Sequence, residues 1–191
     1  MRRVTVLVAC VLVLGTLAMA QLETKPVEVP KTEFYIGYAF LHADTSGSNI
    51  VSSTNLNGFA FEFSHYMHSH NLGFTIDLAR TSNSKVDSTG IKYLRTSYMA
   101  GPTYRIHNIG FFTANVHALA GIDRDDFTVP QTSTTIDYRN TDLAAAVGAT
   151  VDGNLSRHLA LRVAQVDYIY TNHNNTNQGS FRYTGGVVAR F

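Results

Sequence analysis

The chain has 191 residues with 15 Lys and Arg against 14 Asp and Glu, a balance that gives no reason to expect a nucleic-acid partner. Charged residues make up only 15% of the chain, below the roughly 25% of typical soluble proteins. The single cysteine, Cys10, excludes an intramolecular disulfide, and we expect no cofactor.

The first twenty residues have the pattern of a secretory signal peptide. Two arginines precede an apolar run over residues 4–17, and Ala-Met-Ala at 18–20 is typical of a cleavage site. We expect cleavage after Ala20, and removing these 20 of the 191 residues leaves 171, enough for one domain. The alternative is a lipoprotein box at Leu7–Cys10, but it would leave the apolar stretch Val11–Ala20 attached to the mature chain.

Eight later segments alternate apolar residues with small or polar ones, which is the period-2 pattern of β-strands. In chain order they are Glu33–Ala43, Gly58–Tyr66, Leu72–Arg80, Ile91–Ile106, Gly110–Ile122, Asp142–Asp152, His158–Tyr170 and Phe181–Phe191. In the second segment Phe59, Phe61 and Phe63 share one face, whereas Ala60 and Glu62 take the other. Each segment is predicted to be a strand of about ten residues, the length that a tilted strand needs to cross a bilayer.

The second face of these segments distinguishes a soluble protein from a membrane protein. It carries mainly Gly, Ala, Ser and Thr, with isolated charges at Glu62, Asp77, Arg95 and Arg162, whereas a solvated face is usually richer in Lys and Glu. Such a face suits a narrow polar lumen in which opposite charges pair. We therefore predict that these four side chains point inward and form ion pairs. The alternative is a water-facing sheet surface in a soluble periplasmic ligand-binding barrel.

Long and short connections alternate between the segments. The long ones are Asp44–Asn55, Thr81–Gly90, Asp123–Asn140 and Thr171–Gly179, and the short ones are Met67–Asn71, His107–Asn108 and Gly153–Arg157. Transmembrane barrels have short periplasmic turns and longer outer loops. We therefore predict an all-β fold, an eight-stranded antiparallel up-and-down transmembrane β-barrel over residues 33–191. Residues 21–32 are predicted to form an N-terminal periplasmic segment before it.

The last segment, FRYTGGVVARF, ends on an aromatic residue, with apolar residues at alternate positions before it: Tyr183, Val187, Ala189 and Phe191. Together with ALRVAQVDYIYT at 160–171, it resembles the OmpA-type family of small eight-stranded outer-membrane β-barrels. The resemblance implies that these four residues form a signal read by the barrel-assembly machinery. The last strand then pairs with the first and leaves no free edge.

The resemblance also has implications for the lumen and for location. Arg162 matches an inward Arg of the family's penultimate strand, Glu62 an inward acid of the second strand, and Arg95 an inward cation of the fourth. It implies an outer-membrane location with membrane lipids around the wall. The peptidoglycan-binding domain of longer members has no counterpart in this sequence, so we do not expect a cell-wall anchor.

The seventh segment contains a conflict between its two faces. If Arg162 points inward, strict alternation sends Gln165 and Asp167 into lipid and hides Tyr168 in the lumen. A charge in lipid costs about 2–4 kcal/mol at the midplane. We therefore predict a β-bulge or local break near Val163–Gln165, after which Asp167 joins the inward ion-pair network. The alternative is that Asp167 already lies above the hydrocarbon.

Two groups of residues are candidate metal ligands. His65, His68 and His70 crowd one turn, but no Cys or acidic ligand lies nearby, so we interpret them as polar turn residues and expect no metal site. The run DRDD at Asp123–Asp126 starts the longest predicted loop. We interpret it as a solvated charge run, with divalent-cation binding as the alternative.

Some small outer-membrane barrels are lipid-modifying enzymes with a Ser, His and acid set on the outer wall. The candidate fragments here are Ser64–His65 and Asn115–His117, and neither supplies a nucleophile, a base and an orienting group on one face. We therefore predict a structural or surface-interaction barrel that is not an enzyme. It would display four polar extracellular loops on a barrel with a filled polar lumen, and the sequence does not identify what the loops bind. A lipid-modifying enzyme is the alternative.

Overall fold

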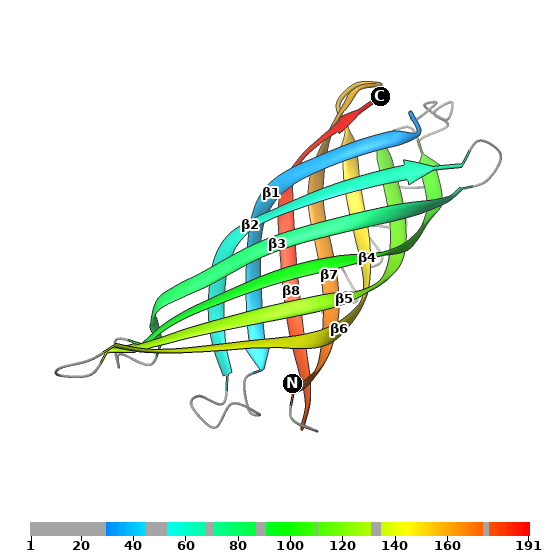
Figure 1. The fold of residues 1–191 in the computed structure, drawn as a ribbon. Coiled ribbons are helices and arrows are strands. Elements are labelled where there is room, and N and C mark those ends of the chain that lie inside the picture. The colour runs from blue at the N-terminus through cyan, green and yellow to red at the C-terminus, as the bar shows by residue number, and fades with distance from the viewer. Residues whose placement is uncertain are drawn as a thin grey trace, which may run out of the picture.

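A computed structural model shows eight strands that close into one barrel (Figure 1). It describes residues 30–44, 53–67, 71–86, 91–109, 111–130, 135–173 and 176–191. The strands are β1 (Thr32–Asp44), β2 (Ser53–Tyr66), β3 (Leu72–Val86), β4 (Ile91–Ile109), β5 (Phe112–Pro130), β6 (Thr135–Asn154), β7 (Leu159–His173) and β8 (Thr176–Arg190). Each strand pairs antiparallel with its neighbours in the chain, and β1 also pairs with β8, which confirms the predicted fold class. The predicted signal peptide and all but the last three residues of the segment at 21–32 lie outside the described residues.

None of the described residues forms a helix of the length and apolarity that crossing a membrane requires.

The middle strands are longer than the sequence predicts. β4 and β5 have 19 residues each and β6 has 20. Because β5 continues to Pro130 and β6 begins at Thr135, most of the predicted loop at 123–140 is a paired hairpin, in which Phe127 lies opposite Tyr138. Aromatic residues favour strands, and their pairing outweighs the polar composition of this stretch.

The pairing of β1 with β8 closes the barrel and joins its first and last strands. β1 and β8 pair from Glu33 opposite Arg190 to His42 opposite Phe181. Beyond the strands, the backbone NH of Phe191 donates to the carbonyl of Thr32 at 2.9 Å, and Thr32 NH donates back at 3.1 Å. The final aromatic residue is therefore held by the first strand, as closure without an edge requires.

β7 contains the predicted bulge. Against β8 the register shifts by one residue between Arg162 and Gln165. The same extra residue shifts the register against β6 by one between Arg162 and Ala164. Val163, at the bulge, is 59% exposed on the outside of the barrel. Beyond it Gln165 and Asp167 are buried inside, so the prediction of a bulge at this position is confirmed.

The outward side chains form a continuous apolar belt. Its residues are Phe34, Ile36, Tyr38, Phe59, Phe61, Leu72, Phe74, Ile76, Leu78, Tyr98, Tyr104, Phe112, Val116, Ile122, Leu143, Val147, Val151, Leu159, Leu161, Val163, Val166, Tyr168, Tyr170, Phe181, Tyr183, Val187 and Phe191. The largest exposed apolar patch of a soluble monomer is typically about 300–600 Å². A belt that runs around all eight strands is instead typical of a barrel surface in contact with the hydrocarbon core of a membrane.

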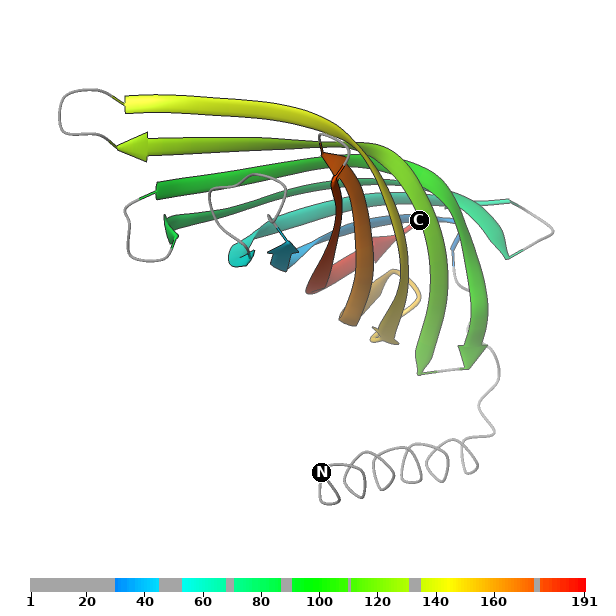
Figure 2. The ribbon, with the colours of Figure 1, turned by 90° about the horizontal axis from the view of Figure 1, so that it is seen from below.

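The barrel is asymmetric along its axis. The short turns and both ends of the barrel domain lie at one end, which we name the short-turn end. At the other end β3 to β6 continue past the belt as two hairpins, which reach beyond β1, β2, β7 and β8 (Figure 2). We name this part, residues 80–86, 91–96, 124–130 and 135–141, the overhang.

Candidate functional site

The five charged residues predicted for the lumen all lie inside the barrel. Glu62, Asp77, Arg95, Arg162 and Asp167 are each no more than 7% exposed. They come from four strands, β2, β3, β4 and β7. Several of their partners lie on β5, β6 and β8 and were not predicted from the sequence.

Arg162 is the centre of one cluster of contacts. Its Nη1 donates to Glu62 Oε1 at 3.1 Å and to Gln165 Oε1 at 2.8 Å, and its Nε donates to Asp152 Oδ1 at 2.9 Å. The guanidinium also lies over the ring of Tyr35, 4.3 Å from the centroid. One side chain on β7 therefore contacts β1, β2 and β6 across the lumen.

Asp167 and Arg182 form the centre of a second cluster. Arg182 donates from Nε to Asp167 Oδ2 and from Nη1 to Asp77 Oδ1, both at 2.8 Å. Asp167 also contacts His117 Nε2 at 2.8 Å and accepts from Gln165 Nε2 at 3.0 Å. Gln165 forms hydrogen bonds with both Arg162 and Asp167, so the two clusters are continuous. The bulge turns the Gln165 side chain into the lumen, where it makes these contacts.

A third cluster lies at the short-turn end. Arg105 Nη2 donates to Glu33 Oε1 at 3.0 Å, and Arg190 Nε lies 2.8 Å from the same oxygen. Arg190 also approaches Asp152 Oδ2 at 3.4 Å, which joins this cluster to that of Arg162. Arg105 covers the ring of Tyr66 at 3.8 Å from its centroid.

The three clusters together form what we name the charged layer of the lumen. Its members are Glu33, Glu62, Asp77, Arg105, His117, Asp152, Arg162, Asp167, Arg182 and Arg190. Five carboxylates face four guanidinium groups and one imidazole, so nearly every buried charge has an opposite one in contact. Glu33, Arg105, His117, Asp152, Arg182 and Arg190 were not predicted as members, although they lie on the inward parity of their strands.

Toward the overhang a large apolar cluster lies in the lumen, among buried polar residues such as Thr81, Ser97 and Ser180. We name this cluster the apolar layer, and its members are Leu41, Ala43, Leu56, Val86, Tyr93, Met99, Leu119, Phe127, Ala144, Ala146 and Ile169. The rings of Tyr93 and Phe127 stack with centroids 4.2 Å apart and planes 4° from parallel. The predicted polar lumen needs correction at this end, where large side chains of inward parity fill the space.

Arg95 lies within the apolar layer, between Tyr93 and Met99 on the inward face of β4. It forms an ion pair with Asp123, lies 3.9 Å from Asp125 and donates to Ser180 Oγ on β8 at 3.3 Å. The interpretation of Asp123–Asp126 as a solvated charge run in a loop is therefore wrong. The run lies in β5, whose alternation turns Asp123 and Asp125 inward and leaves Asp126 on the outer face, 2.6 Å from Arg139.

Only His65 of the three histidines in the predicted turn has a described position. His65 Nδ1 lies 3.0 Å from Thr32 Oγ1, whereas His68 and His70 lie outside the described residues. Among the residues with described positions, no group of three or more His, Cys, Asp or Glu is placed to hold a metal ion.

The two candidate catalytic fragments do not assemble on the outer wall. Ser64 points inward, with its Oγ 2.7 Å from Thr75 Oγ1, whereas the neighbouring His65 is exposed outside. Asn115 and His117 are both buried in the lumen. Neither fragment therefore brings a nucleophile and a base to the lipid-facing surface.

The C-terminal residues lie on the outside. Tyr183, Val187 and Phe191 are 52%, 44% and 70% exposed, and the Phe191 ring lies 6.1 Å from that of Phe34 on β1. Ala189 has the same outward parity and is half-buried. Recognition of these four residues by the assembly machinery stays a prediction.

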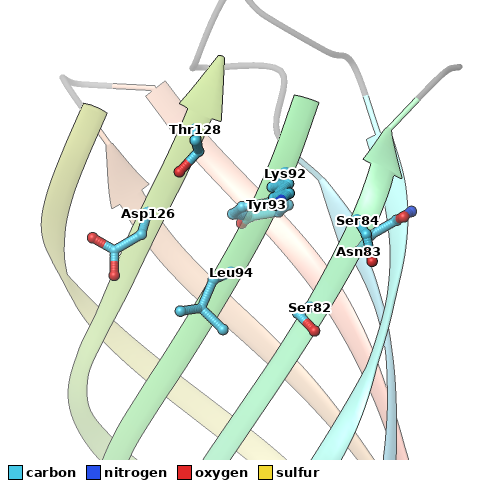
Figure 3. Close-up of a pocket in the computed structure, with 8 residues that line it drawn as sticks. All are labelled: Ser82, Asn83, Ser84, Lys92, Tyr93, Leu94, Asp126 and Thr128. Atoms are coloured by element: carbon cyan, nitrogen blue, oxygen red, sulfur yellow. The ribbon is translucent and has the colours of Figure 1, made fainter. Parts of the chain in front are cut away.

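A shallow pocket opens on the outer face of the overhang (Figure 3). Its volume is about 360 Å³, and it is lined by Ser82, Asn83, Ser84, Lys92, Tyr93, Leu94, Asp126 and Thr128. These residues come from the ends of β3, β4 and β5. Apart from Tyr93 and Leu94, the lining residues have polar or charged side chains of the Ser, Asn, Lys, Asp and Thr types.

A family model described as an outer membrane protein beta-barrel domain matches residues 6–191. The chain belongs to this family. Membership confirms the resemblance to small outer-membrane barrels and places the protein in the outer membrane, while cleavage of the N-terminal signal stays a prediction. No curated protein matches the chain.

Solved barrels of the outer membrane have the same fold. Neisserial surface protein A is 18% identical with a TM-score of 0.65, over 84% of this chain and 97% of that one. Ail of Yersinia pestis is 18% identical with a TM-score of 0.62, over 84% and 99%. The N-terminal barrel of Pseudomonas aeruginosa OprF is 15% identical with a TM-score of 0.51, over 85% and 98%. At these identities the likeness shows the fold alone.

Proposed function

We propose that the protein is a non-enzymatic surface barrel that displays its overhang and hairpin tips outside the cell. The observation that carries this proposal is the asymmetry of the wall. The belt ends at one level on β3 to β6, and polar strands continue beyond it at only one end. Outer-membrane barrels keep their termini and short turns in the periplasm, so the overhang would face outward.

The filling of the lumen argues against a pore. An eight-stranded barrel is just wide enough for its own side chains. Here Arg182 and Arg190 are among the largest fully buried side chains of the charged layer, and Arg95, Leu41 and Leu56 fill the end toward the overhang. A function carried on the outer surface is therefore favoured over transport through the interior.

The polar overhang favours a role in surface interaction over a purely structural one. Its hairpins hold Ser82, Ser84, Lys92 and Thr128 away from the belt on paired strands, where a partner can reach them. Ail is by its name an attachment invasion locus protein, and a shared fold is compatible with a surface role here.

Cysteine labelling in intact cells tests this orientation. Ser84→Cys lies in the overhang, and Leu155→Cys lies in the short turn between β6 and β7; both positions are exposed. Each variant carries Cys10→Ser, so that no other thiol reacts. A membrane-impermeant maleimide should label Ser84→Cys in intact cells and Leu155→Cys only after the outer membrane is permeabilised. Labelling of Leu155→Cys alone in intact cells, or of both only after permeabilisation, would contradict the proposal.

A further inference from the structure

Three outward rows lie in register across β3, β4 and β5 where the belt ends. From the belt toward the hairpin tips they are Leu78, Tyr98 and Ile122; then Arg80, Thr96 and Arg124; then Ser82, Leu94 and Asp126. Successive rows are about 6–7 Å apart along the strands, and neighbouring strands are about 4.8 Å apart. Apolar side chains, arginines and polar groups therefore succeed one another within a short distance on one surface.

The arginine row is open to a ligand. Arg80 and Arg124 flank Thr96, with about 10 Å between their backbones by strand spacing. Arg80 is exposed, and among the described residues no carboxylate lies within ion-pair distance of it. Arg124 lies 3.7 Å from Asp126, yet its Nε is enclosed and donates no hydrogen bond.

Cations on the outer wall are concentrated on this side of the barrel. Of the strand residues whose side chains are described, the outward Arg and Lys are Arg80, Lys92, Arg124 and Arg139, all on β3 to β6. The outward faces of β1, β2, β7 and β8 carry none within those same residues. Four positive side chains thus lie on this side of the barrel near the edge of the belt, and two of them, Arg124 and Arg139, are within ion-pair distance of Asp126.

The pocket on the overhang is the third feature of this surface, after the apolar row and the arginine row. Figure 3 shows Lys92 on β4, Asp126 and Thr128 on β5, and Ser82 on β3 among its lining residues. The row of Ser82, Leu94 and Asp126, which follows the arginine row, belongs to this lining. Hydroxyl groups, an ammonium and a carboxylate can exchange hydrogen bonds with the hydroxyls of a sugar. Guanidinium groups suit phosphate because they can donate two parallel hydrogen bonds to it.

We infer that this surface binds a phosphorylated glycolipid of the outer leaflet. Its acyl chains lie against Leu78, Tyr98 and Ile122, a phosphate lies between Arg80 and Arg124, and sugar hydroxyls enter the pocket. The order of the three rows matches the order of acyl chain, phosphate and sugar in such a lipid. The inference deepens the proposed function, since it rests on the overhang facing outward.

Native mass spectrometry of the purified barrel in detergent tests the site directly. The probes are lipid A with both phosphates and the same lipid after dephosphorylation. The wild type should bind the phosphorylated form at least about tenfold more tightly, because each basic residue near an anionic group adds to the affinity. The double variant Arg80→Gln/Arg124→Gln should lose this preference.

Two further variants separate the site from general effects of charge or folding. Lys31→Gln/Arg157→Gln removes two exposed cations at the short-turn end and should keep the preference. Thr96→Glu places a carboxylate between the two arginines, should remain folded by pairing with them, and should also abolish the preference. Heat-modifiable gel mobility verifies folding of each variant.

Equal binding of both lipids by the wild type would overturn the inference, as would an unchanged preference in Arg80→Gln/Arg124→Gln. Displacement of the lipid by inorganic phosphate at equal concentration would overturn it too, because the site would then recognise a free anion. These results are independent of the cysteine labelling. Labelling of Ser84→Cys in intact cells without a preference for phosphorylated lipid A would contradict only the glycolipid site. A preference for phosphorylated lipid A together with labelling of Leu155→Cys alone in intact cells would contradict only the orientation.

Discussion

The charged layer and the apolar layer fill the same barrel by opposite chemistry. In the charged layer, Arg162 and Asp167 make directional contacts to side chains on several strands. In the apolar layer, Leu119 and Ile169 are buried without any such constraint on geometry. The charged layer therefore specifies the register of the strands, since a misplaced charge loses its partner, whereas the apolar layer mainly contributes apolar burial.

Deleting Val163 should have the largest effect, because the bulge lets β7 keep Arg162 and Asp167 on the same inward face. Without the extra residue one of these charges must face lipid, at a cost of about 2–4 kcal/mol for a charge at the midplane, and its buried partners are left unpaired. We expect no heat-modifiable barrel in outer-membrane fractions. Val163→Ala keeps the residue count and should assemble normally. Equal assembly of the deletion and the substitution would show that the charged layer does not specify the register.

Arg162→Met should come next. It leaves Glu62 without its Arg162 contact and Asp152 with only the longer contact to Arg190. Breaking a buried ion pair from one side typically costs about 3–5 kcal/mol. Urea unfolding in lipid vesicles should show a loss of this size, whereas Arg157→Met in an exposed turn should change the stability by less than about 0.5 kcal/mol. Similar stabilities for the two variants would contradict the role given to Arg162.

Asp167 and Ile169 allow the two layers to be compared on one strand, because both face inward and both are fully buried. Asp167→Asn keeps the shape but weakens the contacts to Arg182 and His117, and we expect a loss of about 3 kcal/mol. Ile169→Val removes one methyl group and should cost about 1 kcal/mol. Urea unfolding of the pair measures the difference. A larger loss for Ile169→Val would reverse the comparison.

Much of this arrangement could be predicted from the sequence, because a strand's two faces are set by parity. The inward direction of Glu62 and Asp77 follows from alternation alone, and the bulge follows from the conflict between Arg162 and Asp167. The partners could not be predicted in this way. Glu62 pairs with Arg162, 100 positions away, and alternation gives a direction without saying which strand lies opposite.

The length of the overhang was missed for a different physical reason. Residues 123–140 are rich in Ser, Thr, Asn and Asp, a composition typical of loops. Pairing between β5 and β6 nevertheless continues to Pro130 opposite Thr135. Part of the apolar layer was missed because Val86 and Phe127 lie in the predicted connections Thr81–Gly90 and Asp123–Asn140, which belong in the structure to β3 and β5 at these positions.

Conductance in planar lipid bilayers tests most directly whether the two layers together fill the lumen. We expect the wild-type barrel, inserted and verified by heat-modifiable mobility, to give no discrete current steps above a detergent control. We expect no continuous path for ions, because bulky side chains of both layers, such as Arg182 and Leu56, are buried inside a barrel that is just wide enough for its own side chains. Reproducible unitary steps from the wild-type protein would contradict a filled lumen, and with it the view that the protein acts through its outer surface.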